Sequence, residues 1–152
     1  MKIVPTRRTD YALRSLIYLA EHPDDRINAA EIGTEMDVPL PILHQVLAEL
    51  QRAGLVTSLS GPRGGYLIAR NPEQLTILEI LETMEGPIRQ GECALRGGPC
   101  HWDEVCAVHP AWSEAREEFA SALASHTLAE VTEMDLRLRH GTAEIPESSH
   151  RR

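Results

Sequence analysis

The sequence lacks any apolar run long enough to cross a membrane. Its longest uninterrupted apolar stretch, Leu16 to Ala20, falls far short of the roughly 20 residues that a membrane-spanning helix needs. The N-terminus also has no apolar core of the kind found in a secretory signal peptide. We therefore expect a cytoplasmic protein.

Cysteine is scarce, and its three copies, Cys93, Cys100 and Cys106, lie close together in the second half of the chain. In a cytosolic protein, an odd number of closely spaced cysteines argues against a disulfide framework and favours metal binding or redox chemistry. The sequence has no C-x-x-C pair and no glycine-rich nucleotide-binding motif, which thiol oxidoreductases and nucleotide-dependent enzymes would need. We expect no enzymatic activity.

The composition is that of an ordinary folded domain, with 42% hydrophobic and 25% charged residues. General disorder and a collagen-like or fibrous class do not fit these fractions. At 152 residues the chain suits one domain, or one small domain with an appendage, and can bury a core. A large multidomain enzyme is excluded.

The net charge of −8 would by itself argue against nucleic-acid binding, because phosphates require a basic surface. The acidic excess, however, belongs to the second half alone. Residues 1–72 contain 8 basic and 8 acidic side chains, whereas residues 73–152 contain 7 and 15. Seven of these eight basic residues gather near the N-terminus and in residues 51–72: Lys2, Arg7, Arg8, Arg14, Arg52, Arg63 and Arg70. The two halves are expected to face different partners.

Three helices are predicted before residue 54. Apolar positions from Arg7 to Ala20 form a broad helical stripe without Gly or Pro. Asn28 with Glu31 has the form of a capping box and opens a short helix that ends near Asp37. After a proline-rich turn, a third helix ends at Gly54 and is marked by apolar residues at i, i+3, i+4 and i+7: Leu43, Val46, Leu47 and Leu50.

A hairpin is predicted next, with strands Leu55–Ser60 and Tyr66–Ala69 joined by the glycine-rich residues 61–65. Three helices followed by a hairpin form a winged helix-turn-helix. In that fold the third helix enters the DNA major groove and the hairpin tip touches the backbone or minor groove. We expect a mainly α protein with a small β-hairpin wing.

The second half is predicted to be helical on both sides of a cysteine loop. Thr76 with Glu79 forms a capping box for a helix that Gly86 stops. Residues 88–108 have no periodicity and contain all three cysteines, so we expect a metal centre to order this loop.

Two further helices are expected after the loop. Residues from Trp112 to Leu123 present a narrow apolar stripe that suits dimer packing. Thr127 with Glu130 caps a last short helix.

Several sequence elements occur together in one order. They are TDYALRSLIYLA at residues 9–20, LQRAGLV at 50–56, the wing string GPRGGY at 61–66, and cysteines spaced C-x6-C-x5-C after a Gly-Pro helix stop. Together they resemble the BadM/Rrf2-type family of bacterial iron–sulfur transcription regulators, which includes NsrR, IscR and RirA. The resemblance covers residues 1–134. A helix-turn-helix pattern is common, but the wing string followed by this cysteine triplet is specific.

The resemblance implies a homodimer on a double-stranded DNA operator, with a long C-terminal helix that crosses to the partner. It also implies an iron–sulfur cluster, [4Fe-4S] or [2Fe-2S], on the three cysteines. A C2 dimer also suits an operator of two half-sites, because each recognition helix reads one of them. We therefore divide the chain into a winged-helix domain (1–72), a cluster-binding loop with dimerisation helices (73–140) and a flexible tail (141–152).

Three thiolates leave such a cluster one protein ligand short. The resemblance supplies two candidates: His109, three residues after Cys106 as in IscR, and Asp10, at the position that NsrR uses, from the other subunit. Both residues are present, and the assignment stays open, although the first-helix string looks more like NsrR and favours Asp10. The plainer interpretations are a Cys3His zinc site, inert buried cysteines, a surface histidine and an N-terminal helix carboxylate.

The start of the third helix holds candidate base-reading residues. The face opposite the apolar stripe carries Ile42, His44, Gln45 and Glu49. His44 and Gln45, with Pro41 beside them, are the candidates, because side chains at the exposed start of this helix reach base edges. The resemblance agrees, because the positions of His44 and Gln45 read bases in IscR. His44 replaces an acidic residue of IscR, which implies a different operator. The plainer interpretation is a solvated helix face.

The wing holds a second set of candidates. Arg63, Gly64 and Gly65 suit phosphate or minor-groove contacts, since glycine allows close approach. Ser60 stands where IscR has its wing arginine, and the plainer interpretation is an ordinary hairpin turn. Arg7 and Arg8, from the basic cluster near the N-terminus, complete the predicted DNA-binding residues.

The sequence therefore predicts a DNA-binding regulator, expected to act as a repressor, whose cluster senses nitric oxide, iron or redox state. Loss or modification of the cluster would free the loop and the first helix and change the spacing of the recognition helices. The alternative is a zinc-stabilised winged-helix regulator with constant DNA binding.

Overall fold

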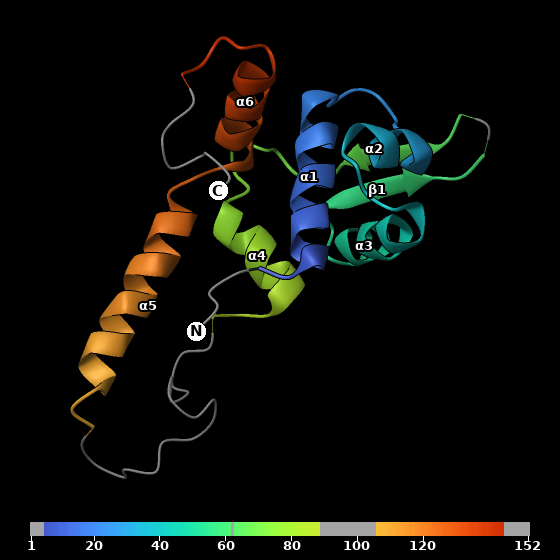
Figure 1. The fold of residues 1–152 in the computed structure, drawn as a ribbon. Coiled ribbons are helices and arrows are strands. Elements are labelled where there is room, and N and C mark those ends of the chain that lie inside the picture. Colours follow the sequence, from blue (N-terminus) through green and yellow to red (C-terminus); the bar gives the residue numbers. More distant parts are fainter. Residues whose placement is uncertain (1–4, 62, 89–105, 145–152) are drawn as a thin grey trace.

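The computed structural model describes residues 5–61, 63–88 and 106–144. These ranges form helices and a two-stranded antiparallel hairpin (Figure 1). In chain order the elements are α1 (Arg7–Glu21), α2 (Ala29–Glu35), α3 (Leu40–Arg52), β1 (Val56–Leu59), β2 (Gly65–Ile68), α4 (Ile77–Glu85), α5 (His109–Ala124) and α6 (Leu128–Arg139). The predicted fold class, mainly helical with a β-hairpin wing, is confirmed.

Side-chain caps fix where several helices begin. Thr76 and Thr127 each accept a hydrogen bond from the backbone N–H of the glutamate three residues later, which accepts one from the cap in return. Both predicted capping boxes are confirmed. Asn28 accepts from the Glu31 backbone N–H at 2.9 Å, but the Glu31 carboxylate accepts from the Asn28 side-chain amide at 3.3 Å and from the Tyr18 hydroxyl at 3.3 Å. The box predicted there is half formed, because these side chains engage Glu31.

The second and third helices end just before their predicted stop residues. α2 ends at Glu35 and α3 at Arg52. The chain turns at Asp37 and Gly54, which have positive φ angles of 51° and 73°. Glycine meets this requirement without steric cost, whereas an aspartate does so with modest strain.

The hairpin is continued on one side by the segment before α2. β1 pairs with β2 in a register that runs from Val56 opposite Ile68 to Leu59 opposite Gly65. Ile27 adds a bridge to Tyr66, with N–H···O distances of 2.9 and 2.8 Å. Gly65 has φ of +152°, and an added Cβ would lie 2.8 Å from the Ile27 carbonyl oxygen. This close approach requires glycine, so the wing is anchored to the helical part of the fold.

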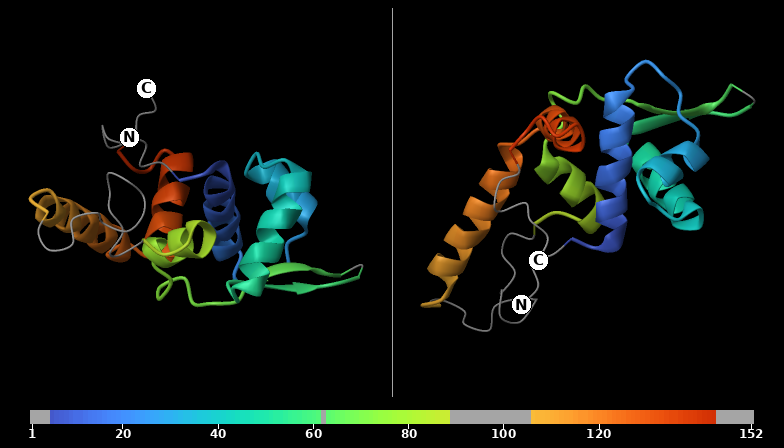
Figure 2. Two further views of the ribbon diagram at one scale, coloured as in Figure 1. Left: turned by 90° about the horizontal axis from the view of Figure 1, so that it is seen from below. Right: turned by 45° about the horizontal axis from the view of Figure 1, so that its top comes forward.

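The hydrophobic core surrounds α1. Ala12, Leu16 and Leu19 on α1 are fully buried, and α1 packs against α3, α4, α6 and β2. The second half of the chain contributes to the same core with fully buried side chains: Leu75, Ile80 and Leu128. α4 and α6 therefore pack directly on the winged helix (Figure 2).

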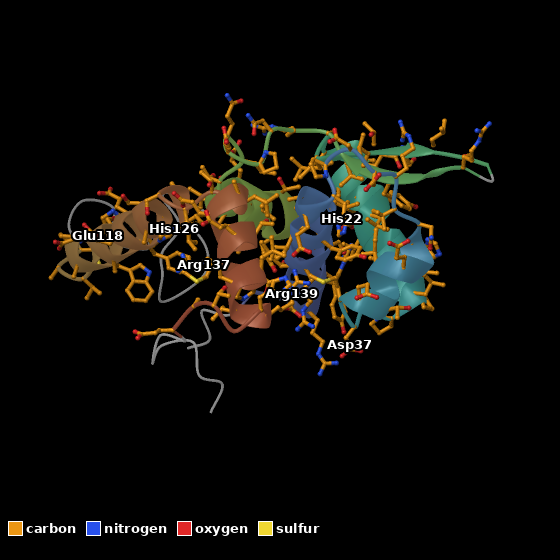
Figure 3. The ribbon with its side chains drawn as sticks, turned by 90° about the horizontal axis from the view of Figure 1, so that it is seen from above. His22, Asp37, Glu118, His126, Arg137 and Arg139 are labelled. Atoms are coloured by element: carbon orange, nitrogen blue, oxygen red, sulfur yellow. The ribbon has the colours of Figure 1, made fainter. Side chains whose placement is uncertain are left out.

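Charged side chains also join α6 to α1. An ion pair joins Arg139 to Glu21, whose side chain is 5% exposed, and Arg139 Nε lies 2.8 Å from Asp135 Oδ2. Figure 3 shows Arg139 where α6 meets α1. Since a nearly buried carboxylate requires a partner, this pair holds the end of α6 on α1.

α5 projects away from the other helices in both views of Figure 2. It has no buried residue, and Phe119 on its predicted apolar stripe is 38% exposed. α5 begins at His109, ahead of the predicted stripe that starts at Trp112. Within the three described ranges, no helix is long and apolar enough to cross a membrane.

Candidate nucleic-acid interface

The exposed face of α3 is set by the stripe that α3 buries. Its buried residues are Leu43, Val46, Leu47 and Leu50, as predicted. Pro41, His44 and Gln45 are exposed, because they lie on the other side of a helix with 3.6 residues per turn. Ala48 and Arg52 continue this exposed row at helical spacing. The row can present polar and basic groups to a groove of DNA.

Two exposed apolar side chains lie at the start of α3, and neither was predicted as a DNA-binding residue. Leu40 is 41% and Ile42 37% exposed, and they flank Pro41 next to the N-cap residue Pro39. Ile42 falls outside the buried stripe, so its exposure could be predicted. Leu40, in contrast, precedes Leu43 and Leu47 by three and seven residues, so the pattern alone would place it on the stripe. In a DNA groove, exposed apolar groups suit the methyl group of thymine.

The wing tip is a tight turn. Ser60 and Arg63 are exposed, and the Gly64 N–H donates to the Gly61 carbonyl at 2.8 Å. An added Cβ at Gly64 would lie 2.1 Å from the Leu59 carbonyl oxygen. The turn itself therefore requires glycine at 64, whatever Gly64 contacts, and it leaves Arg63 projecting from the tip.

Arginines of α1 and α3 meet at one carboxylate. Arg7 and Arg8 are exposed on the first turn of α1. Arg8 forms an ion pair with Glu49 on α3, and the Arg52 guanidinium lies 3.8 Å from the same Glu49 oxygen. Arg52 and Glu49 were not predicted as site residues. Counting helical turns from Pro41 and Gln45 would have found Arg52, whereas the contact with Arg8 depends on how α1 packs on α3.

The first turn of α1 is also bonded to the end of α4. The Glu85 carboxylate accepts from the Thr6 backbone N–H at 2.7 Å and from the Thr9 hydroxyl. The Thr9 hydroxyl bond, followed by the Thr6 backbone bond, lowers the pKa of Glu85 below its ordinary 4.5. Glu85 is the last residue of α4, and the segment that contains the cysteines, residues 88–108, follows soon after it. This carboxylate therefore connects the first turn of α1, which carries Arg7 and Arg8, to the chain just before the cysteine segment.

The predicted metal ligands are described only in part. Cys93 and Cys100 lie outside the described residues. Cys106 is half-buried ahead of α5, and its carbonyl accepts from the His109 backbone N–H at 3.2 Å. Asp10 forms an ion pair with Arg14 at 3.0 Å. Residues 5–61, 63–88 and 106–144 contain no group of three or more His, Cys, Asp and Glu side chains that could hold a metal.

Asp10 and His109 stand on elements that lie apart. Asp10 belongs to the first turn of α1 and His109 to the first turn of α5, and Figures 1 and 2 show these helix starts separated in every view. His109 Nε2 lies 3.2 Å from the Ser113 hydroxyl. One chain therefore does not bring the two candidate fourth ligands together.

A pocket of about 350 Å³ lies between α4 and α5. Ile88 and His109, from the two sides of residues 89–105, both face it. Its lining residues are Leu78, Glu82, Ile88, His109, Ser113, Arg116, Glu117 and Ala120. The pocket thus places a candidate metal-binding imidazole beside carboxylate and hydroxyl groups.

Comparison with known proteins identifies the family. Residues 5–134 match the Rrf2 family, described as iron-dependent transcriptional regulators. A protein of Aquifex aeolicus classed among HTH-type transcriptional regulators is 32% identical over 127 residues, 82% of this chain and 88% of its own length. The HTH-type transcriptional regulator IscR of Xenorhabdus nematophila is 28% identical over 127 residues, covering 83% of this chain and 77% of IscR.

Solved structures agree with this match. CymR, the global cysteine regulator of B. subtilis, superposes with a TM-score of 0.74 at 27% identity over 88% of this chain and 98% of CymR. IscR of T. potens has the same fold, with a TM-score of 0.70 at 22% identity over 99% of this chain and 97% of IscR. The chain therefore belongs to the Rrf2 family of DNA-binding transcription regulators and is not an enzyme.

Proposed function

We propose that this chain is a homodimeric repressor that works in the cytoplasm and uses an iron–sulfur cluster to sense nitric oxide, iron or redox state. The observation that carries the proposal is the Glu85 link. One end of the link is the α1 turn with Arg7, Arg8 and Asp10, and the other is the residue that leads into the cysteine segment. A change at the cluster would thereby reach the DNA-binding half.

In the DNA complex, α3 reads the major groove and the hairpin follows the adjacent backbone. His44 and Gln45 contact base edges, with Pro41 beside them, since all three are exposed on one face of α3. Ser60, Arg63 and Gly64 contact phosphates or the minor groove from the wing, and Arg7 and Arg8 contact the backbone from α1.

The cluster is held by Cys93, Cys100 and Cys106 with one further ligand. Three soft thiolates in an iron-dependent family suit an iron–sulfur cluster. When bound, the cluster supplies iron that reacts with nitric oxide or changes its oxidation state. The protein's own part is to supply the three thiolates, of which Cys106 lies just ahead of α5, and to connect this segment, through α4, to α1.

The fourth ligand is Asp10 or His109, and each has its own support. His109 is close in sequence to Cys106 and faces the pocket between α4 and α5. Asp10 is 49% exposed in its ion pair with Arg14, so it is open to a ligand outside its own helix. Because α1 and α5 begin apart in one chain, ligation by Asp10 would use the partner subunit's copy.

A dimer formed through α5 is supported by the exposure of that helix. α5 has no buried residue in the single chain. Phe119 on its apolar stripe is 38% exposed, and Val108, the residue just before the helix, is 45% exposed. A second copy of α5 would cover these groups. The resulting twofold symmetry matches an operator with two half-sites.

The alternative is a zinc-stabilised winged-helix regulator with constant DNA binding. It is favoured by the donor set, because three cysteines with His109 would make a Cys3His set of the kind that zinc binds.

Metal analysis separates the two functions. Protein purified without oxygen should be coloured and contain iron and sulfide, and the colour should bleach on addition of nitric oxide, oxygen or a chelator. A colourless, iron-free and zinc-loaded protein would sink the cluster proposal. Asp10→Ala and His109→Ala should differ in cluster retention, which identifies the fourth ligand.

Gel shifts on a duplex from the protein's own promoter test sensing. Holo and apo protein should differ in affinity, with the difference preserved over a range of salt concentrations. Equal affinity of the two forms would remove the sensing mechanism and leave a constant DNA binder.

A further inference from the structure

Glu49 is an acid on the DNA-binding helix, where a carboxylate would ordinarily be unfavourable. Its side chain is 28% exposed, and it lies in the C-terminal half of α3 next to the exposed row that ends at Arg52. A lone carboxylate at this place would repel DNA phosphates. Its presence therefore requires a local explanation.

The explanation lies in its two arginine partners. Arg8 of α1 forms an ion pair with Glu49 and is 52% exposed, and Arg52 lies 3.8 Å from the same oxygen and is 75% exposed. Arg52 Nε also donates to the Ala48 carbonyl at 3.3 Å. The carboxylate is thus less exposed than the two guanidinium groups beside it, and the three side chains together carry a net charge of +1.

Arginine geometry makes this arrangement suitable for phosphate. A guanidinium has five N–H donors in a planar fork, and a bond to Glu49 uses only some of them. Arg8 engages Glu49 through Nη2, and Arg52 Nη2 at 3.8 Å is beyond hydrogen-bond distance from it, so both guanidinium groups keep donors for a phosphate. Next to Arg52 is an open hollow of about 370 Å³, which leaves room for a phosphate group there. Its lining residues are Glu49, Arg52, Ala53, Thr83 and Met84.

We propose that Glu49 is a positioning residue that holds Arg8 and Arg52 as a two-arginine clamp on one DNA phosphate. Glu49 joins the first turn of α1 to α3, so the clamp also fixes the distance between these helices at the DNA. This clamp rests on the DNA-binding function of the family. It adds Arg52 to the residues that contact the DNA backbone, and Glu49 as the residue that positions Arg8 and Arg52.

Salt titrations of the full-length protein on a duplex of scrambled sequence test the clamp, because phosphate contacts do not depend on sequence. The slope of log K against log salt is negative, and Arg8→Ala and Arg52→Ala should each reduce its magnitude by about one per bound chain. Glu49→Ala should weaken binding about tenfold at low salt and reduce the magnitude of the slope, although it makes the protein less acidic. Glu49→Ala binding that is as tight as or tighter than wild type, with an unchanged slope, would overturn the proposal.

The sign of the effect distinguishes positioning from a structural role. In the Arg8→Ala/Arg52→Ala background, adding Glu49→Ala should tighten DNA binding, because the carboxylate then only repels phosphate. A structural role would weaken binding in both backgrounds, and that result would contradict the clamp. Glu49→Gln, which keeps an acceptor oxygen for the arginines, should retain more binding than Glu49→Ala.

Glu73→Ala is the matched control. Glu73 is an exposed acid between the wing and α4, and its removal changes the net charge by the same amount. It should leave the slope as in wild type. Wild-type protein that binds no duplex at all would contradict DNA binding itself, whereas wild-type behaviour of Glu49→Ala contradicts only the clamp.

Discussion

Gln45 projects from the exposed row of α3, so Gln45→Ala should change sequence preference more than salt dependence. A glutamine that pairs with a base edge provides about 1–3 kcal/mol of discrimination, whereas phosphate contacts determine the salt slope. We expect Gln45→Ala to lose preference for the promoter duplex and to keep wild-type affinity for a scrambled duplex. Fluorescence anisotropy titrations of both duplexes measure this.

Arg63→Ala should have the opposite pattern of effects to Gln45→Ala, because Arg63 is expected to contact phosphate and not a base. Arg63 is exposed at the wing tip. Its removal should weaken binding to both duplexes and reduce the magnitude of the salt slope by about one per bound chain. Equal weakening of both duplexes by Gln45→Ala would show that Gln45 does not read a base.

Single residues differ in how far the sequence predicts them. His44 and Gln45 follow from the stripe that ends at Leu50, because the buried face of a helix determines its exposed face. Glu49 could not be predicted as a partner of Arg8. The two residues are 41 positions apart, and only the packing of α1 on α3 brings them together.

Helix boundaries in this chain are largely local properties, and they were predicted well. Thr76 and Thr127 open α4 and α6 because each can form a capping box within its own first turn. The bond from Thr9 to Glu85 joins residues 76 positions apart. No periodicity contains that information, so the link between α1 and α4 required the folded structure.

The α1–α4 link should make stability depend on acid pH. The hydrogen bonds from Thr9 and Thr6 hold the folded-state pKa of Glu85 below 4.5. A lowered folded-state pKa means that the carboxylate stabilises the fold above pH 4.5 and that this contribution is lost as the pH falls through the folded-state pKa. Glu85→Gln should therefore be less stable than wild type at pH 7, and the difference should shrink towards pH 3.5.

Urea unfolding at several pH values measures this difference. The matched control is Thr9→Val, which removes the hydroxyl that contributes most to the shift. In the Thr9→Val background, Glu85→Gln should have a smaller effect at pH 7. A Glu85→Gln difference that stays constant between pH 7 and 3.5 would mean that the ionised carboxylate does not stabilise the link.

At the scale of the whole molecule, the described chain leaves one helix without a full set of neighbours. α1, α3, α4 and α6 share one core, whereas α5 buries no residue. The sequence predicted an apolar stripe on α5 suited to a dimer, and exposure of Phe119 agrees with that stripe. The partner itself is a property of two chains, which neither the stripe nor a single chain determines.

Phe119→Asp should therefore dissociate the protein without unfolding it. Phe119 is 38% exposed in the single chain, so its loss removes little from the core, while a charge at a dimer interface without a partner is strongly unfavourable. We expect a monomer by sedimentation, a wild-type helix signal by circular dichroism, and a large loss of affinity for an operator with two half-sites. Affinity for a single half-site should change little, because each winged helix is intact.

Ser121→Asp is the control, since it introduces the same charge on α5 at a residue that is exposed on the opposite face of the helix. A Phe119→Asp protein that stays dimeric would place the subunit interface on another part of the chain.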